Sequence, residues 1–429
     1  MRKFDQITED YSRQPVPDSA TVTGLRITVV MVGAVITLPI FFVAAQLGHS
    51  LGLRNAIIAF FVAGVFLAGL AGAAGVLASK TRLTTWFILK YSFGGMGAKI
   101  VSAFIGITVL GWYGATVEMF ARAVVAIVRD LGGTPMDNRV YLIIASILMI
   151  AIALFGFKGL DRLSRLALPI MLVLLGSLVY TAISTFGIPA QSVGEMPLSQ
   201  GISATIGAFI VAVAMFPDVC RYARSSKDAV QASWLSFGLG VPIVLLLAAI
   251  PITLSGEQDF LKVILTIGLG VPGLVLLLLA TWTTNAFNLY SSSLVFATII
   301  ERVQKWKLVI VVGILGTLVA LLPILDNFLY FLNFLAALVP PLAGIYLSDY
   351  FVLNKQKYDA EDLKQLPAFR PVAFVAWILG SLVGLFANEG KIALTSVPAA
   401  DAILTAFLIY TVLSYVLKNK KKTFHDNLD

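Results

Sequence analysis

The chain has 429 residues and a net charge of +8; 59% of its residues are hydrophobic and only 13% are charged. A typical soluble protein is roughly half apolar and about one quarter charged, and a mean hydropathy of +0.91 lies far outside that range. The composition excludes a soluble enzyme, a disordered chain and a nucleic-acid-binding protein, and it indicates a membrane protein with many spans. One cysteine and two histidines exclude an internal disulfide and a histidine-based metal site.

Residues 1–24 are polar and predict a cytoplasmic tail without a cleavable signal peptide. A helix needs about 20 mostly apolar residues to cross the hydrocarbon core. By this measure the chain contains twelve predicted spans, at 25–48, 55–78, 98–127, 139–157, 165–187, 201–217, 232–254, 263–297, 308–323, 328–352, 371–388 and 401–417. The third, eighth and tenth are long, which predicts tilt or interruption. Residues 418–429 form a basic cytoplasmic tail.

The distribution of Lys and Arg supports this count. If the amino terminus is cytoplasmic, 25 of the 31 basic residues fall on the inside and 6 on the outside. Cytoplasmic loops carry the excess of basic residues in membrane proteins. The split therefore favours twelve spans with both termini in the cytoplasm, and membrane topology accounts for the positive net charge.

Two predicted spans contain both a glycine and a proline. The first has Gly33 and Pro39, and the sixth has Gly207 at its middle and Pro217 near its end. Proline removes a backbone donor and glycine tolerates unusual dihedral angles, so both spans are predicted to be broken. They lie five spans apart, the offset of a five-plus-five inverted repeat whose broken helices build a central site. Ordinary kinking is the alternative, because Gly and Pro are common in membrane helices.

The eighth span is unusually polar, with the string ATWTTNAFNLYSSS. The adjacent hydroxyls of Thr283 and Thr284 offer oxygen ligands to a hard cation such as sodium. Backbone carbonyls of a broken first span, around Gly33 and Ile36, would complete the shell. The alternative is that these hydroxyls bond their own helix or join neighbouring helices.

Several charged residues lie in or beside the spans. Glu118 is predicted to form a local ion pair with Arg122, four residues later. Asp218 and Arg221, at the inner end of the sixth span, are predicted to form an interfacial pair, with a gate as the second interpretation. Asp349 is predicted to lie at the interface. Glu118, Asp218 and Arg221 are also the candidates for a gate or a proton-linked role.

Trp112 follows a glycine in the third span, and Phe209 lies beside Gly207 in the sixth. Aromatic faces on either side of a cavity can sandwich a planar ring. Ordinary packing is the alternative, since aromatic residues are plentiful in the core of any membrane bundle.

Six strings in this order resemble one family nearly end to end: QPVPDSA (14–20), KTRLTTWFILKYSFGGMG (80–97), VLGWYG (109–114), FPDVCRYAR (216–224), TWTTNAFNLYSS (281–292) and LVPPLAGIYLSDY (338–350). The chain resembles the nucleobase–cation symporter family, nearest to its bacterial cytosine permease branch. The resemblance implies an all-α integral membrane fold of about twelve transmembrane helices. Residues 25–187 and 201–352 would be the two halves of a leucine-transporter-type inverted repeat, and residues 371–417 two extra helices.

The resemblance also implies uptake of a planar nitrogen heterocycle, driven by a cation gradient through alternating access. In such permeases an aromatic residue from the third helix and one from the sixth stack the ring, and these positions match Trp112 and Phe209. The family's sodium site matches the carbonyls of the first helix and of Ala280, together with two hydroxyls. The matched positions are Gly33, Ile36, Ala280, Thr283 and Thr284.

Four positions depart from the cytosine carriers of this family, which have a glutamine, two serines and an asparagine there. The matching residues are Val109, Ala208, Val211 and Ala280. A buried donor or acceptor left unpaired costs about 1–3 kcal/mol, so a less polar or larger ring, such as a substituted pyrimidine or a vitamin precursor, is expected instead of cytosine. The remaining candidate polar contacts are Thr116, Asn285 and Asn288.

The sequence thus predicts a secondary active transporter of a bacterial cytoplasmic membrane, with sodium as the coupling ion. The partners expected are the heterocycle and the lipid bilayer, with no nucleic acid, no obligate protein partner and no cofactor beyond the coupling ion. Proton coupling is the alternative within this class. The rivals from other classes are a membrane enzyme, disfavoured because no span carries a histidine, and a transporter-like sensor or channel.

Overall fold

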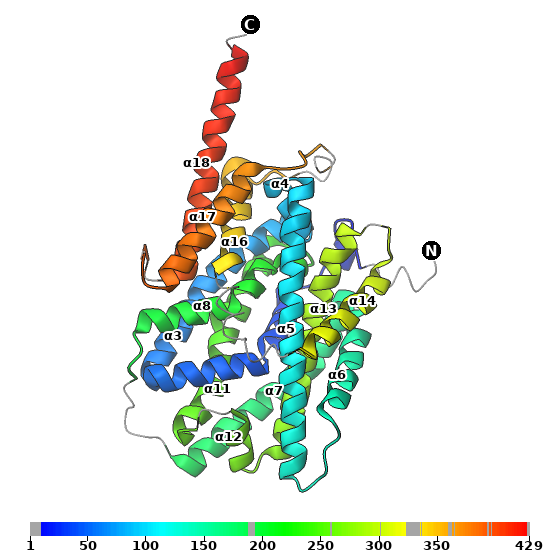
Figure 1. Cartoon of the computed structure of the whole chain (residues 1–429), viewed down its shortest axis with the longest axis vertical. Helices are drawn as coiled ribbons and strands as arrows, with labels where there is room; N and C mark the ends of the chain where they lie inside the picture. The colour runs from blue at the N-terminus through cyan, green and yellow to red at the C-terminus, as the bar shows by residue number, and fades with distance from the viewer. Residues whose placement is uncertain are drawn as a thin grey trace.

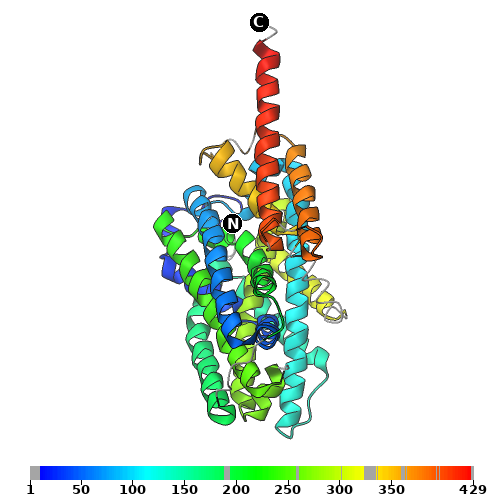
Figure 2. The same cartoon turned by 90° about the vertical axis from the view of Figure 1, so that its left-hand side faces the viewer.

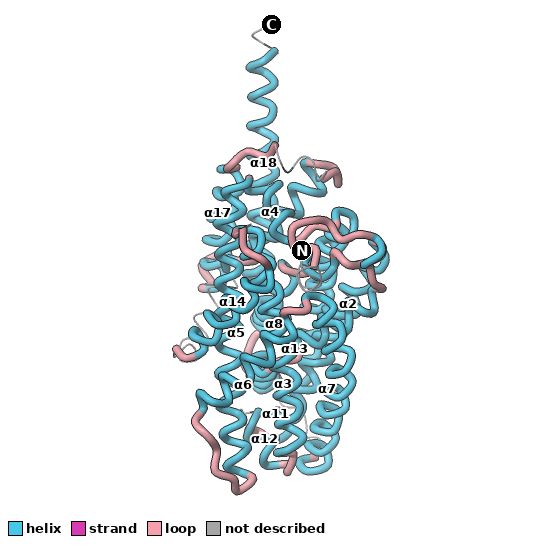
Figure 3. The backbone as a smooth tube through the Cα atoms, turned by 90° about the vertical axis from the view of Figure 1, so that its right-hand side faces the viewer, coloured by secondary structure: helices cyan, strands magenta, loops and turns pink. Residues whose placement is uncertain are grey.

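The structure, a computed structural model, describes residues 10–426 apart from 188–193, 258–259, 301, 323–334, 336, 359–362, 364, 393 and 396, with side chains described up to residue 418. Parts of both predicted tails and much of the predicted tenth span therefore lie outside the described residues. The described chain is helical, as Figure 3 shows, and its β structure is one isolated bridge between Val22 and Ala223.

The helices follow one another in the order predicted. They are η1 (Asp18–Ala20), α2 (Gly24–Val35), α3 (Leu38–Thr81), α4 (Thr85–Phe93), α5 (Gly95–Asp130), α6 (Asn138–Ala153), α7 (Gly156–Phe186), α8 (Leu198–Ala214), α9 (Pro217–Cys220), α10 (Ser226–Ser233), η2 (Trp234–Gly240), α11 (Val241–Ser255), α12 (Phe260–Thr266), α13 (Gly270–Ile299), α14 (Lys305–Ala320), α16 (Pro340–Ser348), η4 (Asp349–Leu353), α17 (Pro371–Asn388) and α18 (Pro398–Asp426). Within the described residues, seven helical stretches are long and apolar enough to cross a membrane. This confirms an all-α protein with several candidate spans.

The first predicted break is present. Helix α2 ends at Val35, Thr37 has extended dihedrals (φ −154°, ψ 154°), and α3 begins at Leu38. Pro39 lies in the first turn of α3, where a missing backbone N–H has no cost because that donor has no partner within the helix. Helix α3 then continues to Thr81, and the predicted loop between the first two spans is reduced to one non-helical residue, Gly52.

The second break is displaced from its predicted position. Helix α8 runs through Gly207 without interruption and ends at Ala214. The chain breaks at Met215 and Phe216, immediately before Pro217 starts α9. The prediction that centred this break on Gly207 was wrong, because a single glycine is tolerated within a helix while proline removes a backbone donor and restricts the residue before it.

Two further differences concern short helices. The long predicted eighth span is divided into α12 and α13, with Gly268 at φ +74° between them. Helix α4 was not predicted, although its ends carry signals. The Thr84 side chain caps its start by accepting from the Phe87 N–H, and Gly94 ends it at φ +83°. Threonine caps and positive-φ glycines are common helix boundaries.

Helix α13 lies at the centre of the bundle, packed against α2, α5, α6, α7 and α14. Helix α3 packs against α8, α10 and α11. The last two helices, α17 and α18, pack on each other and on α16, and Figures 1 and 2 show α18 projecting beyond the rest of the molecule. The break in α2 thus faces the central helix, while α17 and α18 form a lateral addition.

Asp349 anchors this lateral addition. The prediction of an interfacial position was wrong, since the residue is fully buried. Its carboxylate accepts hydrogen bonds from the Tyr410 hydroxyl (2.6 Å), from the Asn354 amide (2.9 Å) and from the Tyr358 hydroxyl, and Arg370 approaches it at 3.7 Å. One carboxylate therefore ties the end of α16 to α18 and to the loop before α17.

Replacing Asp349 by alanine should destabilise the protein by about 3 kcal/mol, because it leaves several buried donors without an acceptor. The thermal unfolding midpoint of the detergent-solubilised protein measures this change. Asp18→Ala is the matched control, because the Asp18 side chain is 97% exposed. Equal midpoints for the two variants would contradict the assigned role.

Candidate functional site

A small cavity lies beside the break between α2 and α3. It has a volume of about 70 Å³ and is formed by that break together with α5, α8 and α13. Drug-sized ligand pockets are several times larger, so the cavity is nearly closed in this conformation. Six of the predicted substrate-binding residues line it, namely Trp112, Phe209, Val109, Ala208, Val211 and Asn288. The structure therefore gathers residues from three predicted spans at one place.

The walls of this cavity are mostly apolar. Trp112 from α5 and Phe209 from α8 both line it, as the prediction of a stacked ring requires. Its polar side chains are Asn288, Thr284 and Thr37. Sequence reasoning missed Thr37, although it lies between Gly33 and Pro39. The hydroxyl of Thr37 is buried and has no hydrogen-bond partner within the protein.

Three predicted contacts lie outside the described lining of this cavity. The Thr116 hydroxyl donates to the Trp112 carbonyl (2.5 Å) in its own helix. The Asn285 amide donates to the Tyr113 carbonyl (3.4 Å), and its oxygen accepts from the Asn288 amide (3.0 Å). Asn285 therefore orients Asn288 and joins α13 to α5. Ala280 belongs to the neighbouring oxygen cluster.

The oxygen cluster is formed by the end of α2 and the middle of α13. The Thr283 hydroxyl lies 2.7 Å from the Gly33 carbonyl and 3.1 Å from the Ala280 carbonyl. The Thr284 hydroxyl lies 2.8 Å from the Ala34 carbonyl and 3.3 Å from the Ile36 carbonyl. All five residues predicted for the cation site are thus brought together, and Ala34 joins them.

The break explains why these carbonyls are available. The last carbonyls of a helix have no partner within that helix, and bulk water does not reach the interior of a bilayer. Each threonine hydroxyl can donate to one carbonyl and still turn a lone pair toward an ion. The cluster contains neutral oxygens, and the described residues contain no group of three or more His, Cys, Asp or Glu that could hold a metal. Such a donor set suits a singly charged hard cation.

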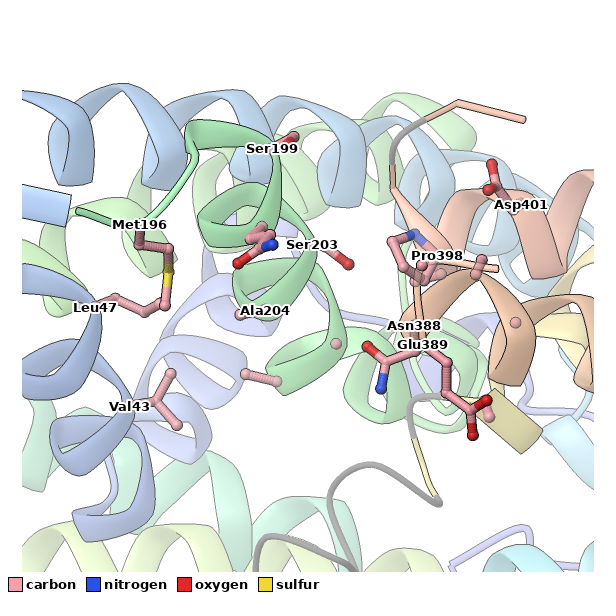
Figure 4. Close-up of a pocket in the computed structure, with 18 of the residues that line it drawn as sticks. Val43, Leu47, Met196, Ser199, Ser203, Ala204, Asn388, Glu389, Pro398 and Asp401 are labelled. Atoms are coloured by element: carbon pink, nitrogen blue, oxygen red, sulfur yellow. The ribbon is translucent and has the colours of Figure 1, made fainter. Parts of the chain in front are cut away.

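A second cavity, of about 660 Å³, opens next to the first. It lies between α3, α8, α17 and α18, and the two cavities share Ala208. Figure 4 shows Ser199 and Ser203 on one side of it and Asn388 and Glu389 on the other. The larger cavity therefore gives the small one an approach past the first half of α8.

The charged residues lie away from the small cavity. Glu118 pairs with Arg122, as predicted. The predicted side-chain pair between Asp218 and Arg221 is absent: Arg221 donates instead to the Asp218 backbone carbonyl (3.1 Å). The Asp218 carboxylate accepts from the Thr85 N–H (2.8 Å) and has one oxygen without a partner. Asp218 lies beyond the end of α8 and outside the candidate spans, and burial raises its pKa to about 6 against the opposing effect of the Thr85 hydrogen bond.

Comparison with known proteins agrees with this arrangement. Residues 15–412 match the family described as permeases for cytosine/purines, uracil, thiamine and allantoin. The cytosine permease of Escherichia coli (strain K12) is 30% identical over 419 residues, with 96% of each chain covered. The hydantoin permease of Microbacterium maritypicum is 26% identical over 64% of this chain and 61% of its own.

A solved structure has the same fold. It is Mhp1, a nucleobase-cation-symport-1 family transporter in a closed conformation with bromovinylhydantoin bound, with a TM-score of 0.83 and 21% identity over 94% of this chain and 95% of that one. These relatives are permeases and transporters, which confirms both the resemblance and the expectation that the chain is not an enzyme. The chain belongs to the nucleobase–cation symporter family of permeases.

Proposed function

We propose that this permease is a secondary active symporter that imports a planar nitrogen heterocycle together with sodium. One observation carries the proposal. Thr284 lines the small cavity, and its hydroxyl also belongs to the oxygen cluster. An ion in the cluster and a ring in the cavity would therefore share one side chain, so that each can change the affinity for the other.

The proposed cycle follows from the break between α2 and α3. A cation among the end carbonyls of α2 stabilises one position of α2 against α13 and so favours one of two conformations. The heterocycle then binds beside it between Trp112 and Phe209. Alternating access would open this site to each side of the membrane in turn. The proposal includes twelve spans, the five-plus-five inverted repeat, both termini in the cytoplasm and a location in a bacterial cytoplasmic membrane.

The lining of the cavity bears on the substrate. Val109, Ala208 and Val211 all line it, so three of the four departures from the cytosine carriers face the ring site. The fourth, Ala280, supplies a carbonyl to the oxygen cluster. An apolar lining offers few partners for the polar edge of cytosine. We therefore propose a less polar or substituted ring, and the bromovinylhydantoin bound by Mhp1 is one such chemistry.

Proton coupling is the second candidate, and Asp218 favours it because its pKa of about 6 lies in the physiological range. Glu118 is the other carboxyl group considered. Uptake that follows a pH gradient and ignores sodium would support this alternative. A sensor or channel is the rival from another class. Counterflow against a concentration gradient separates it from a transporter, since a channel cannot concentrate its solute.

The double substitution Thr283→Ala/Thr284→Ala should abolish sodium-stimulated uptake in proteoliposomes, because it removes two oxygen ligands. The apparent sodium affinity should fall by at least about tenfold, the lower range seen when the surroundings of a bound metal ion are altered. Thr298→Ala is the matched control, because that hydroxyl bonds carbonyls of α13 itself, far from the break. Undiminished stimulation in the double variant would reject the sodium site.

Replacing Trp112 by alanine should weaken heterocycle binding by about 10–100-fold, since stacking of one base on an aromatic side chain contributes about 1–3 kcal/mol. Thermal stabilisation by a panel of heterocycles measures the change, because a ligand that binds the native state raises its stability. Trp234→Ala, at an indole that is 44% exposed, is the control. A panel response unchanged by Trp112→Ala would place the ring elsewhere.

The double substitution Ala208→Ser/Val211→Ser should shift the same panel toward cytosine. Two hydroxyls in the cavity would pair polar groups of the base, which predicts a gain in cytosine affinity of about tenfold. Substitution of Ser177→Ala, whose hydroxyl bonds its own helix on α7, should leave the panel unchanged. Strong cytosine binding by the original protein would contradict the proposed substrate class.

A further inference from the structure

Residues 10–22, which we call the strap, cross the end of the molecule that carries Arg82, Arg221 and Lys305. Its later part is held by backbone hydrogen bonds. The Val22 N–H donates to the Tyr222 carbonyl (2.7 Å), and the Arg224 N–H donates back to the Val22 carbonyl (3.0 Å). Its first residues turn inward, with Asp10 and Tyr11 at φ 52° and 51°. Asp10 is 8% exposed and Ser12 is fully buried.

The Asp10 carboxylate lies between three segments that are far apart in sequence. It accepts from the Phe157 N–H at the start of α7 (3.2 Å) and from the Lys305 ammonium at the start of α14 (3.3 Å). The Arg221 guanidinium, just after α9, lies 3.9 Å away. One buried carboxylate thus holds together the ends of α7, α9 and α14.

Gly156 makes room for this carboxylate. A Cβ atom on Gly156 would lie 2.5 Å from the carboxyl carbon of Asp10, and the glycine has φ +59°. Both the close approach and the positive φ require glycine. The turn before α7 is therefore shaped to receive Asp10.

Arg221 holds the backbone of the strap. Its buried guanidinium donates to the Tyr11 carbonyl (2.8 Å) and to the Asp10 carbonyl (3.1 Å), and it also contacts the Tyr290 hydroxyl of α13 (3.2 Å). Arg13 reaches in the other direction, to the carbonyls of Ala297 at the end of α13 (3.0 Å) and Val303 (2.5 Å). The strap therefore joins the segment after α9 to the end of α13.

These contacts lie on the side of the small cavity opposite to the larger one. The larger cavity meets α8 between Ser199 and Ala208, whereas the strap contacts the chain beyond the end of α8, at Arg221 and Tyr222. Met215 and Phe287 line the small cavity, and Arg221 and Tyr290 follow them toward the strap. A ligand leaving in this direction would have to pass between α9 and α13, beneath the strap.

We propose that the strap is the inner gate of the transport cycle and that Asp10 is the residue that locks it. This inference rests on the alternating access proposed above. Closed, the strap ties α9 to α7, α13 and α14; for the cavity to open toward this end, Asp10 must leave Lys305 and the Phe157 N–H. Because removing one partner of a buried charge pair leaves the other uncompensated, loss of the Asp10 charge releases the strap.

The test measures access to the strap from its own side of the membrane. Ser12→Cys is introduced together with Cys220→Ala, so that the protein carries one thiol, and a membrane-impermeant maleimide is added to vesicles with the strap side outward. Asp10→Asn should accelerate labelling by about tenfold or more. Lys305→Gln, on the other side of the contact, should do the same, and it carries the test if Asp10→Asn does not fold.

Asp18→Asn is the matched control, the same chemical change in the same strap at an exposed ion pair with Arg82 (3.3 Å). Its labelling rate should stay within about twofold of the parent. In the parent protein, adding a transported heterocycle should raise the labelling rate as the gate opens at each turnover. Equal rates in parent, Asp10→Asn and Lys305→Gln would overturn the proposal, as would a parent rate that turnover leaves unchanged. Labelling reports the strap alone, so a failure of sodium coupling would appear only in uptake.

Discussion

The structure depends on how the carbonyls at the end of α2 are satisfied. A helix that stops inside a membrane leaves several carbonyls without a partner and out of reach of bulk water, at a cost of several kcal/mol for each unsatisfied group. Here the hydroxyls of Thr283 and Thr284 accept this role from α13, at 2.7 and 2.8 Å. The interrupted helix is therefore stable only against this part of α13, and the small cavity lies beside that junction.

The same constraint links the site to the rest of the molecule. Helix α13 packs against α2, α5, α6, α7 and α14, so a movement of α2 along α13 is felt by most of the bundle. One end of α13 is held by the strap through Arg13 and, by way of Tyr290, through Arg221. Cation, heterocycle and strap thus act on one central helix. This arrangement provides a physical path by which binding in the cavity changes contacts beyond α9.

The polar groups of the small cavity are few and unevenly satisfied. Asn288 is oriented by Asn285, which is itself held to α5, whereas the hydroxyl of Thr37 has no partner within the protein. A buried polar group without a partner is costly, so a ligand that bonds it gains affinity. The apolar neighbours Val109 and Val211 make the rest of the wall indifferent to polar ring substituents. Selectivity in such a site comes from shape and from one or two hydrogen bonds.

Sequence alone determined the class of protein, the order of its helices and the residue types of its site. Composition identified the membrane protein, Gly33 and Pro39 marked the first break, and the adjacent threonines marked the cation ligands, because these signals are local. Tertiary structure decided what depends on distant neighbours. It moved the second break to Met215, buried Asp349, directed Arg221 to the strap instead of the Asp218 carboxylate, and added Thr37 to the cavity. Hydrogen-bond partners tens or hundreds of residues away make these choices, and no local pattern encodes them.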